Sequence, residues 1–107
     1  MKKEIIVDLR AKKEIQQFPM PVQLEILNLI SVLEQGGMLD EPDGKKLSGH
    51  SNLFEMRIRY KGQWRVIYAY YLENQILLLT AFQKKTQKTP LLIIKKAIRR
   101  LNLYSYK

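Results

Sequence analysis

The chain of 107 residues contains no cysteine and only one histidine, His50. Without cysteine there is no disulfide, no thiolate nucleophile and no cysteine-based metal site. A single histidine also excludes a metal centre built from several histidines. We therefore expect neither a metal nor any other cofactor.

Long apolar runs and targeting patterns are missing as well. The longest apolar stretches are far too short to cross a bilayer. The start, Met1-Lys2-Lys3-Glu4, leads at once into a short strand-like run and does not resemble a signal peptide. The length is typical of one domain, residues 1–107. We expect a single soluble domain in the cytoplasm, with no membrane partner.

Acidic residues are almost absent from the second half. After Met56 there is one acid, Glu73, beside twelve Lys and Arg, whereas the first 56 residues hold nine acids and seven bases. All of the net charge of +9 therefore comes from the second half. Solubility alone would be achieved equally well by charge spread over the whole chain. A basic field on one half of a small domain favours a polyanionic partner, most commonly nucleic acid.

The apolar periodicity predicts an α+β domain with the order β-α-α-β-β-β-α. An N-terminal helical hairpin, broken at Pro19 and Pro21, and a C-terminal helix after Pro90 are expected on one side of an antiparallel sheet. Strands are expected over residues 4–7, 53–60, 64–71 and 76–82, and helices over 9–18, 21–36 and 91–103.

Basic residues should converge on the predicted hairpin. Residues 53–60 alternate with period two, which places Glu55, Arg57 and Arg59 on one face. With a three-residue loop at 61–63, Arg59 lies opposite Arg65 on that same face. Like charges in this position repel, and a bound anion between them would remove the repulsion. On charge alone, ordinary solvated arginines are an equal alternative.

A basic loop follows the last predicted strand. The run Lys84-Lys85-Thr86-Gln87-Lys88-Thr89 supplies three lysines and two hydroxyls before a helix N-terminus, where phosphate oxygens can be held. Together with the arginines, this loop favours a nucleic-acid site over ordinary solvated charges.

Metal-free RNA cleavage by the ribose 2′-hydroxyl is the feasible chemistry. It needs a base, cations for the charged phosphorane and an acid for the leaving oxygen. Arginines supply the cations. Glu55, or a lysine whose pKa is lowered by cationic neighbours, could be the base. His50 is interpreted as a solvated loop residue.

Four motifs follow one another in the chain: Lys45-Lys46-Leu47-Ser48-Gly49, Leu53-Phe54-Glu55-Met56-Arg57-Ile58-Arg59, Trp64-Arg65-Val66-Ile67-Tyr68 and Phe82-Gln83-Lys84-Lys85-Thr86-Gln87-Lys88-Thr89-Pro90. In this order they resemble the RelE/ParE toxin superfamily, and most closely its phage-derived HigB-like branch. The resemblance implies a RelE-like fold and the toxin of a type II toxin–antitoxin pair. Members of the RelE kind cut mRNA in the ribosomal A site without a metal. The partners that the resemblance implies are mRNA, the ribosome and a helix-turn-helix HigA-like antitoxin.

The same resemblance implies roles for individual residues. Arg57 is similar to the proposed general base, Arg65 to the cation that stabilises the transition state, and Lys85 to a second such cation. Because an arginine has a pKa above about 12, Glu55 is the alternative base. The general acid stays unassigned. The RNA backbone is expected to contact Arg59, Lys61, Lys84 and Lys88.

Two other functions stay open. A ParE-like toxin shares the fold but inhibits DNA gyrase, and such chains usually lack a full set of cations on this face. A non-catalytic RNA-binding module would need the same charges for binding alone.

Overall fold

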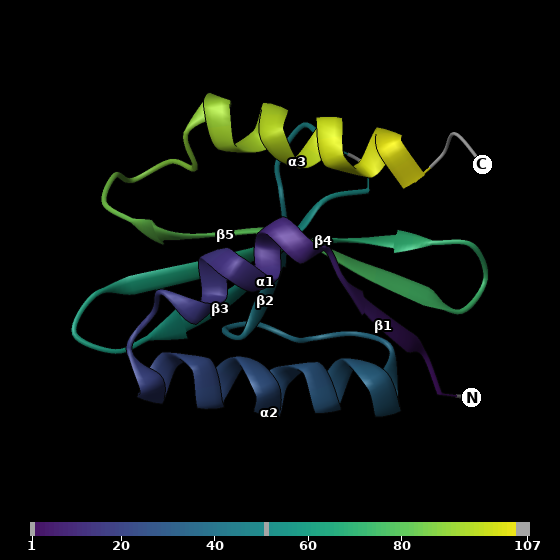
Figure 1. Cartoon of the computed structure of the whole chain (residues 1–107), viewed down its shortest axis with the longest axis horizontal. Coiled ribbons are helices and arrows are strands. Elements are labelled where there is room, and N and C mark those ends of the chain that lie inside the picture. The colour runs from purple at the N-terminus through teal and green to yellow at the C-terminus, as the bar shows by residue number, and fades with distance from the viewer. Residues whose placement is uncertain (1, 51, 105–107) are drawn as a thin grey trace.

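The computed structural model describes residues 2–50 and 52–104 (Figure 1). The predicted elements are all present, and a short strand, β2, is added in the segment that the sequence assigned to a loop. In chain order the elements are β1 (Glu4–Val7), α1 (Leu9–Gln16), α2 (Met20–Gly36), β2 (Gly44–Lys46), β3 (Phe54–Arg59), β4 (Gln63–Tyr71), β5 (Gln75–Lys84) and α3 (Leu91–Tyr104).

The five strands form one sheet in the order β1-β5-β4-β3-β2. Strands β3 to β5 pair antiparallel, as predicted, and the additional strand β2 pairs antiparallel with β3. Strand β1 instead pairs parallel with β5, from Glu4 opposite Gln75 to Val7 opposite Leu78. The parallel pair arises because the α1–α2 hairpin carries the chain across the sheet, so that β1 and β2 lie at opposite edges.

Helices cover both faces of the sheet, which corrects the expectation that they lie on one side. Figure 1 shows α2 below the sheet and α3 above it. Residues of β4 and β5 are apolar on both faces, so each face needs a covering layer. The α2 core contains Val22, Ile26, Leu29, Leu33, Met56, Ile58, Val66, Tyr68, Ile76 and Leu78. The α3 core contains Leu47, Leu53, Ile67, Ala69, Leu77, Leu79 and Ala97.

Helix α1 lies against the edge of β5 beyond the point where β1 ends. Asp8 is buried, its backbone N–H donates to Leu78 O, and its carboxylate caps the helix by accepting the Arg10 N–H at 2.9 Å. One turn later, Glu14 accepts the backbone N–H of Ala81 at 3.0 Å. A side-chain carboxylate thus continues the edge pairing that β1 begins.

The same carboxylate anchors α3. Glu14 also accepts the Thr80 hydroxyl and two nitrogens of the Arg100 guanidinium, each at 3.0 Å. Arg100 is buried and donates further to Leu79 O at 2.8 Å. This network fixes α3 over the sheet face that carries the arginines of β3 and β4. None of the described helices has the length and apolar character needed to cross a membrane.

Candidate active site in a basic cleft

The β3–β4 hairpin brings two arginines face to face, although not the predicted pair. Arg57 lies opposite Arg65, and Arg59 lies opposite Gln63. The loop is three residues long, as predicted, but it consists of residues 60–62. Its turn uses Gly62 at φ 138° and Lys61 at φ 48°, both in the region that favours glycine. The register therefore differs by two positions from the prediction. The predicted face is confirmed, because a shift of two keeps Glu55, Arg57, Arg59 and Arg65 together.

Glu55 is the centre of this arrangement. It is only 2% exposed. One carboxylate oxygen lies 3.5 Å from Arg57 Nε and 3.7 Å from Arg65 Nε. The other oxygen accepts a hydrogen bond from the Thr89 hydroxyl. One buried anion thus lies between two opposed cations, and it offsets the repulsion expected of them.

Arg65 is held by its surroundings, which corrects the expectation of a solvated strand charge. It is 6% exposed, because α3 and the loop before it cover this face. Its two terminal nitrogens donate to Trp64 O at 3.0 Å and to Gln63 Oε1 at 3.1 Å. Its Nε, like that of Arg57, is buried and has no hydrogen-bond partner within the described part of the chain. Arg57 is more open, with 24% of its side chain exposed.

The pKa values of two cations at this site, Arg65 and Lys84, are lowered. Burial, and secondarily Arg57 and Arg59, lower the pKa of Arg65, against the opposing effect of Glu55. Lys84 at the end of β5 is half-buried in the same cluster. Burial lowers the pKa of Lys84 most, Glu55 opposes this effect, and Arg65, Arg57 and Lys45 lower it further.

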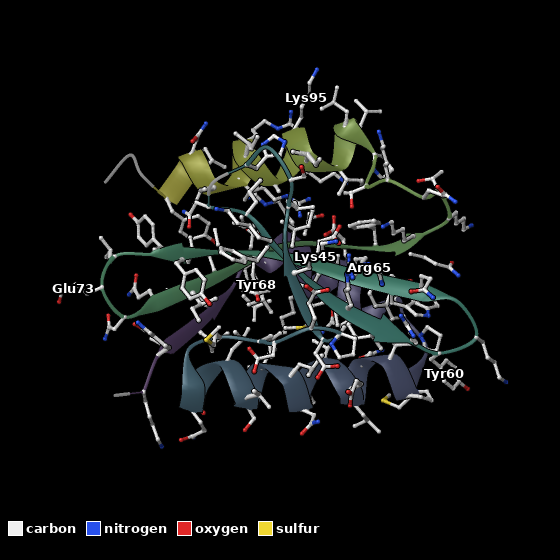
Figure 2. The ribbon with its side chains drawn as sticks, turned by 180° about the vertical axis from the view of Figure 1, so that it is seen from behind. Lys45, Tyr60, Arg65, Tyr68, Glu73 and Lys95 are labelled. Atoms are coloured by element: carbon white, nitrogen blue, oxygen red, sulfur yellow. The ribbon has the colours of Figure 1, made fainter. Side chains whose placement is uncertain are left out.

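A cleft of about 420 Å³ opens over this cluster. Glu55 and Arg57 belong to its lining, together with Lys84 and Lys88 of the predicted basic loop. Lys45 and Lys46 of β2 complete its basic lining. Figure 2 shows Lys45 and Arg65 in one region of the sheet, away from Glu73 in the β4–β5 turn.

Four of the predicted site residues lie outside the cleft lining, and the buried Arg65 is one of them. Lys85 is exposed on the loop and does not line the cleft, whereas its neighbour Lys84 does. Lys61 is at the hairpin tip, with its Nζ 5.5 Å from the centre of the Tyr60 ring. Arg59 is exposed and lines a separate hollow of about 380 Å³ with Tyr60. His50 lies in the turn before β3, and its backbone N–H donates to Leu47 O.

Three residues of the site were missing from the sequence-based set: Lys45, Lys46 and Thr89. All three belong to the motifs that carry the family resemblance, so their presence there was an available signal. Lys45 and Lys46 were not assigned to the site because the sequence of their segment is typical of a loop. The pairing of Lys45 with Glu55 across β2 and β3 brings the lysines to the cleft. Across residues 2–50 and 52–104, no group of three His, Asp or Glu side chains is arranged to hold a metal ion.

Comparison with known families decides where the chain belongs. Residues 13–102 match the family described as phage derived protein Gp49-like. The chain is a member of this family. Among curated proteins, no sequence match was found.

Solved structures of RelE toxins share the fold of this Gp49-like protein. An arginine-to-alanine double mutant of Escherichia coli toxin RelE in the free state superposes with a TM-score of 0.72 at 17% identity, covering 94% of this chain and 99% of that one. The archaeal RelE–RelB complex from Pyrococcus horikoshii gives a TM-score of 0.62 at 25% identity, covering 79% and 98%. The intact E. coli RelBE toxin–antitoxin complex gives 0.64 at 18%, covering 78% and 99%. The RelE-like fold and the resemblance to the RelE/ParE superfamily are confirmed.

Proposed function

We propose that this Gp49-like protein is the toxin of a type II toxin–antitoxin system and cleaves mRNA in the ribosomal A site without a metal. The observation that carries the proposal is the cleft, which is lined by Arg57, Lys84 and the rim lysines and has at its floor the buried carboxylate of Glu55, paired with Arg57 and Arg65. The fold shared with RelE toxins supports it. Such a site suits a polyanion that gains charge as it reacts.

The arginines stabilise that charge. In the reaction the ribose 2′ oxygen attacks the adjacent phosphorus, the 5′ oxygen leaves, and a cyclic phosphate remains. Arg57, which lines the cleft, offers a planar fork of donors that matches phosphate oxygens, and Arg65 lies opposite it in the neighbouring strand. Lys45, Lys46 and Lys88 at the rim hold the neighbouring phosphates.

Lys84 is the group best suited to move the proton. An arginine keeps its proton, so Arg57 is a poor base. Glu55 is 2% exposed, pairs with both arginines and already accepts the Thr89 hydroxyl, so its oxygens are poorly placed to take a proton from a ribose. Lys84 lines the cleft, and the lowered pKa of its ammonium raises the fraction of neutral amine at physiological pH. In this assignment neutral Lys84 takes the 2′ proton, and the leaving oxygen takes a proton from water.

The partner of this toxin is an antitoxin encoded beside it. The RelE proteins from E. coli and P. horikoshii form complexes with RelB. For the present chain we propose a helix-turn-helix antitoxin of the HigA kind with an acidic surface, because the second half of the chain carries eleven more bases than acids.

Induced expression of the chain alone tests the function. We expect bacterial growth to stop and new mRNA 5′ ends to accumulate inside translated regions. Purified protein should cut a message bound to ribosomes and leave a 2′,3′-cyclic phosphate on the upstream fragment. The Lys84→Met variant, expressed to the same level, is the matched control and should produce far fewer ends.

Two results would redirect the assignment. Intact mRNA with collapsed DNA supercoiling would establish a gyrase-inhibiting, ParE-like toxin. Tight RNA binding by purified protein, with normal growth and no cleavage on or off the ribosome, would establish a non-catalytic binding module.

A further inference from the structure

Thr89 connects the segment before α3 with Glu55, and it has no part in the proposed reaction. It is half-buried and is the last residue before Pro90, where the chain turns into α3. Its hydroxyl donates to one oxygen of Glu55, across 34 positions of sequence. This bond joins the segment in front of α3 to the floor of the cleft.

The bond fixes the rotation of a shared carboxylate. With one oxygen held by Thr89, the other lies between Arg57 Nε and Arg65 Nε, at 3.5 and 3.7 Å. Without that hydroxyl the carboxylate can turn towards one guanidinium and form two bonds with it, because an arginine offers a fork of donors. The second arginine would then lose its counter-ion.

The same bond closes the basic loop. Residues 85–89 leave β5 at Lys84 and return to the sheet face at Thr89. Within the loop, the Thr86 hydroxyl donates to Lys88 O at 2.6 Å, which is a local turn bond. Thr89 makes the long-range contact. The position of Lys88 at the rim of the cleft therefore depends on the contact of Thr89 with Glu55.

We propose that Thr89 is a positioning residue that, through Glu55, orients the guanidinium groups of Arg57 and Arg65 and holds the basic loop over the cleft. The inference rests on the proposed function for its kinetic consequence. Its structural content, the coupling of one hydroxyl to two arginines, is independent of which reaction the cleft performs.

Three variants test this role. Thr89→Val removes the hydroxyl and keeps the β-branched shape, Thr89→Ser keeps the hydroxyl, and Thr86→Val removes the other hydroxyl of the same loop, which does not touch Glu55. Thermal unfolding of each variant establishes that it is folded. The kinetic readout is the cleavage rate on programmed ribosomes at saturating and at limiting toxin.

We expect Thr89→Val to lower the rate at saturation by on the order of 10-fold, since one hydrogen bond to a charged group is lost. The half-saturating concentration should change by less than about 2-fold, because the rim lysines that bind the backbone are untouched. Thr89→Ser should restore the rate. A Thr89→Val protein with the parent rate, or a Thr89→Ser protein as slow as Thr89→Val, overturns the proposal.

A second measurement separates this inference from the proposed function. In ¹⁵N-labelled protein the Nε–H signals of Arg57 and Arg65, assigned from the Arg57→Lys and Arg65→Lys variants, report their surroundings directly. We expect both signals to shift in Thr89→Val and to stay in place in Thr86→Val. If the parent cuts no RNA but both signals respond, the proposed function fails and the coupling stands. If the parent cuts RNA and neither signal responds, the coupling fails and the proposed function stands.

Discussion

Arg57 and Arg65 lie directly opposite each other in the β3–β4 pair, and both have a buried Nε that no hydrogen bond from residues 2–50 or 52–104 satisfies. Two like charges in this position cost free energy in a sheet. Glu55 offsets that cost in part, with one carboxylate oxygen between the two guanidinium groups. Arg57 lines the cleft, so a phosphate bound there would be a second anion beside this pair. In the proposed reaction the two arginines would stabilise the charge that develops on that phosphate.

Substitution of Arg65 should impair both the activity and the stability of the protein. Arg65→Ala removes a transition-state cation, which typically lowers a rate by on the order of 100-fold or more. It also leaves the Gln63 side chain and Trp64 O without their donors, so we expect a loss of about 1–3 kcal/mol in the free energy of unfolding. Denaturant unfolding measures the stability, and cleavage is measured where both proteins are folded. Arg99→Ala, an exposed charge on α3, is the control and should change neither. Full activity in Arg65→Ala would show that this arginine is only structural.

Substitution of the neighbouring residues Lys84 and Lys85 tests which of the two lysines acts in the cleft. The family resemblance assigns the second cation to Lys85, whereas the cleft contains Lys84. We expect Lys84→Met to lose at least about 100-fold in rate and Lys85→Met to lose less than about 5-fold, because removal of a general base costs on the order of 10²–10⁴-fold. Rates on programmed ribosomes for the two variants decide between the assignments, and the reverse order would support the resemblance.

The pH dependence of cleavage follows from the lowered pKa of Lys84. In the proposed mechanism the neutral amine is the active form, so the rate should rise with pH and level off below the ordinary lysine value of 10.5. Lys84→Arg keeps the charge but cannot deprotonate, and its residual rate should be independent of pH. Single-turnover rates between about pH 6 and 9 provide the measurement. A parent rate that falls as pH rises would assign Lys84 to the acid role.

Stability towards acid should depend on Asp8. Burial alone would raise its pKa, but hydrogen bonds from Arg10 and Tyr104 outweigh burial and lower the pKa from 3.8 to about 2. Because the folded value is the lower one, the stabilisation is present above pH 3.8 and is lost as pH falls towards 2. Asp8→Asn keeps a good helix cap but cannot ionise. Its unfolding free energy should fall less steeply than that of the parent over this interval, and equal slopes would contradict the prediction.

Antitoxin binding should respond to the charges at the cleft rim. We expect the product of the neighbouring gene to co-purify with the chain, and the complex to weaken as salt rises. Changing Lys45, Lys46 and Lys88 together to Ala should slow association more than the matched variant of Lys13, Lys95 and Arg99. Equal association rates would place the docking surface elsewhere. Absence of any complex would remove the main support for a toxin–antitoxin pair.

Sequence periodicity predicted the strands and the charged face of β3, but it could not fix the hairpin offset. A shift of two positions leaves every side chain on its face, so alternation alone does not distinguish Arg59 from Arg57 as the partner of Arg65. The conformation of the loop determines the offset between the two strands, and it depends on whether Lys61 adopts a positive φ. That property is not visible in a pattern of polar and apolar residues.

Burial of the site was less predictable than its composition. The prediction of a solvated Arg65 assumed that α3 lies on the same side as α2. Ile67 and Ala69 share the face of Arg65, and both are completely buried. Their apolar character was a signal in the sequence that this face also carries a core. Which lysine of the 84–88 run enters the cleft depends on where β5 ends, and strand ends are set by tertiary contacts.

The position of β1 has a consequence for the order of folding. Its partner in the sheet is β5, so that Glu4 and Gln75, which are 71 positions apart, meet side by side. Arg100 reaches Glu14 across 86 positions. Contacts this distant form late, because the intervening chain must first be ordered. We expect the β3–β4–β5 meander to assemble first, and β1 and α3 to pack against it afterwards. Thr89 and Ile94 line the cleft, and α3 is held in place by the contact of Arg100 with Glu14. We therefore expect a newly made chain to complete the cleft in its last folding step.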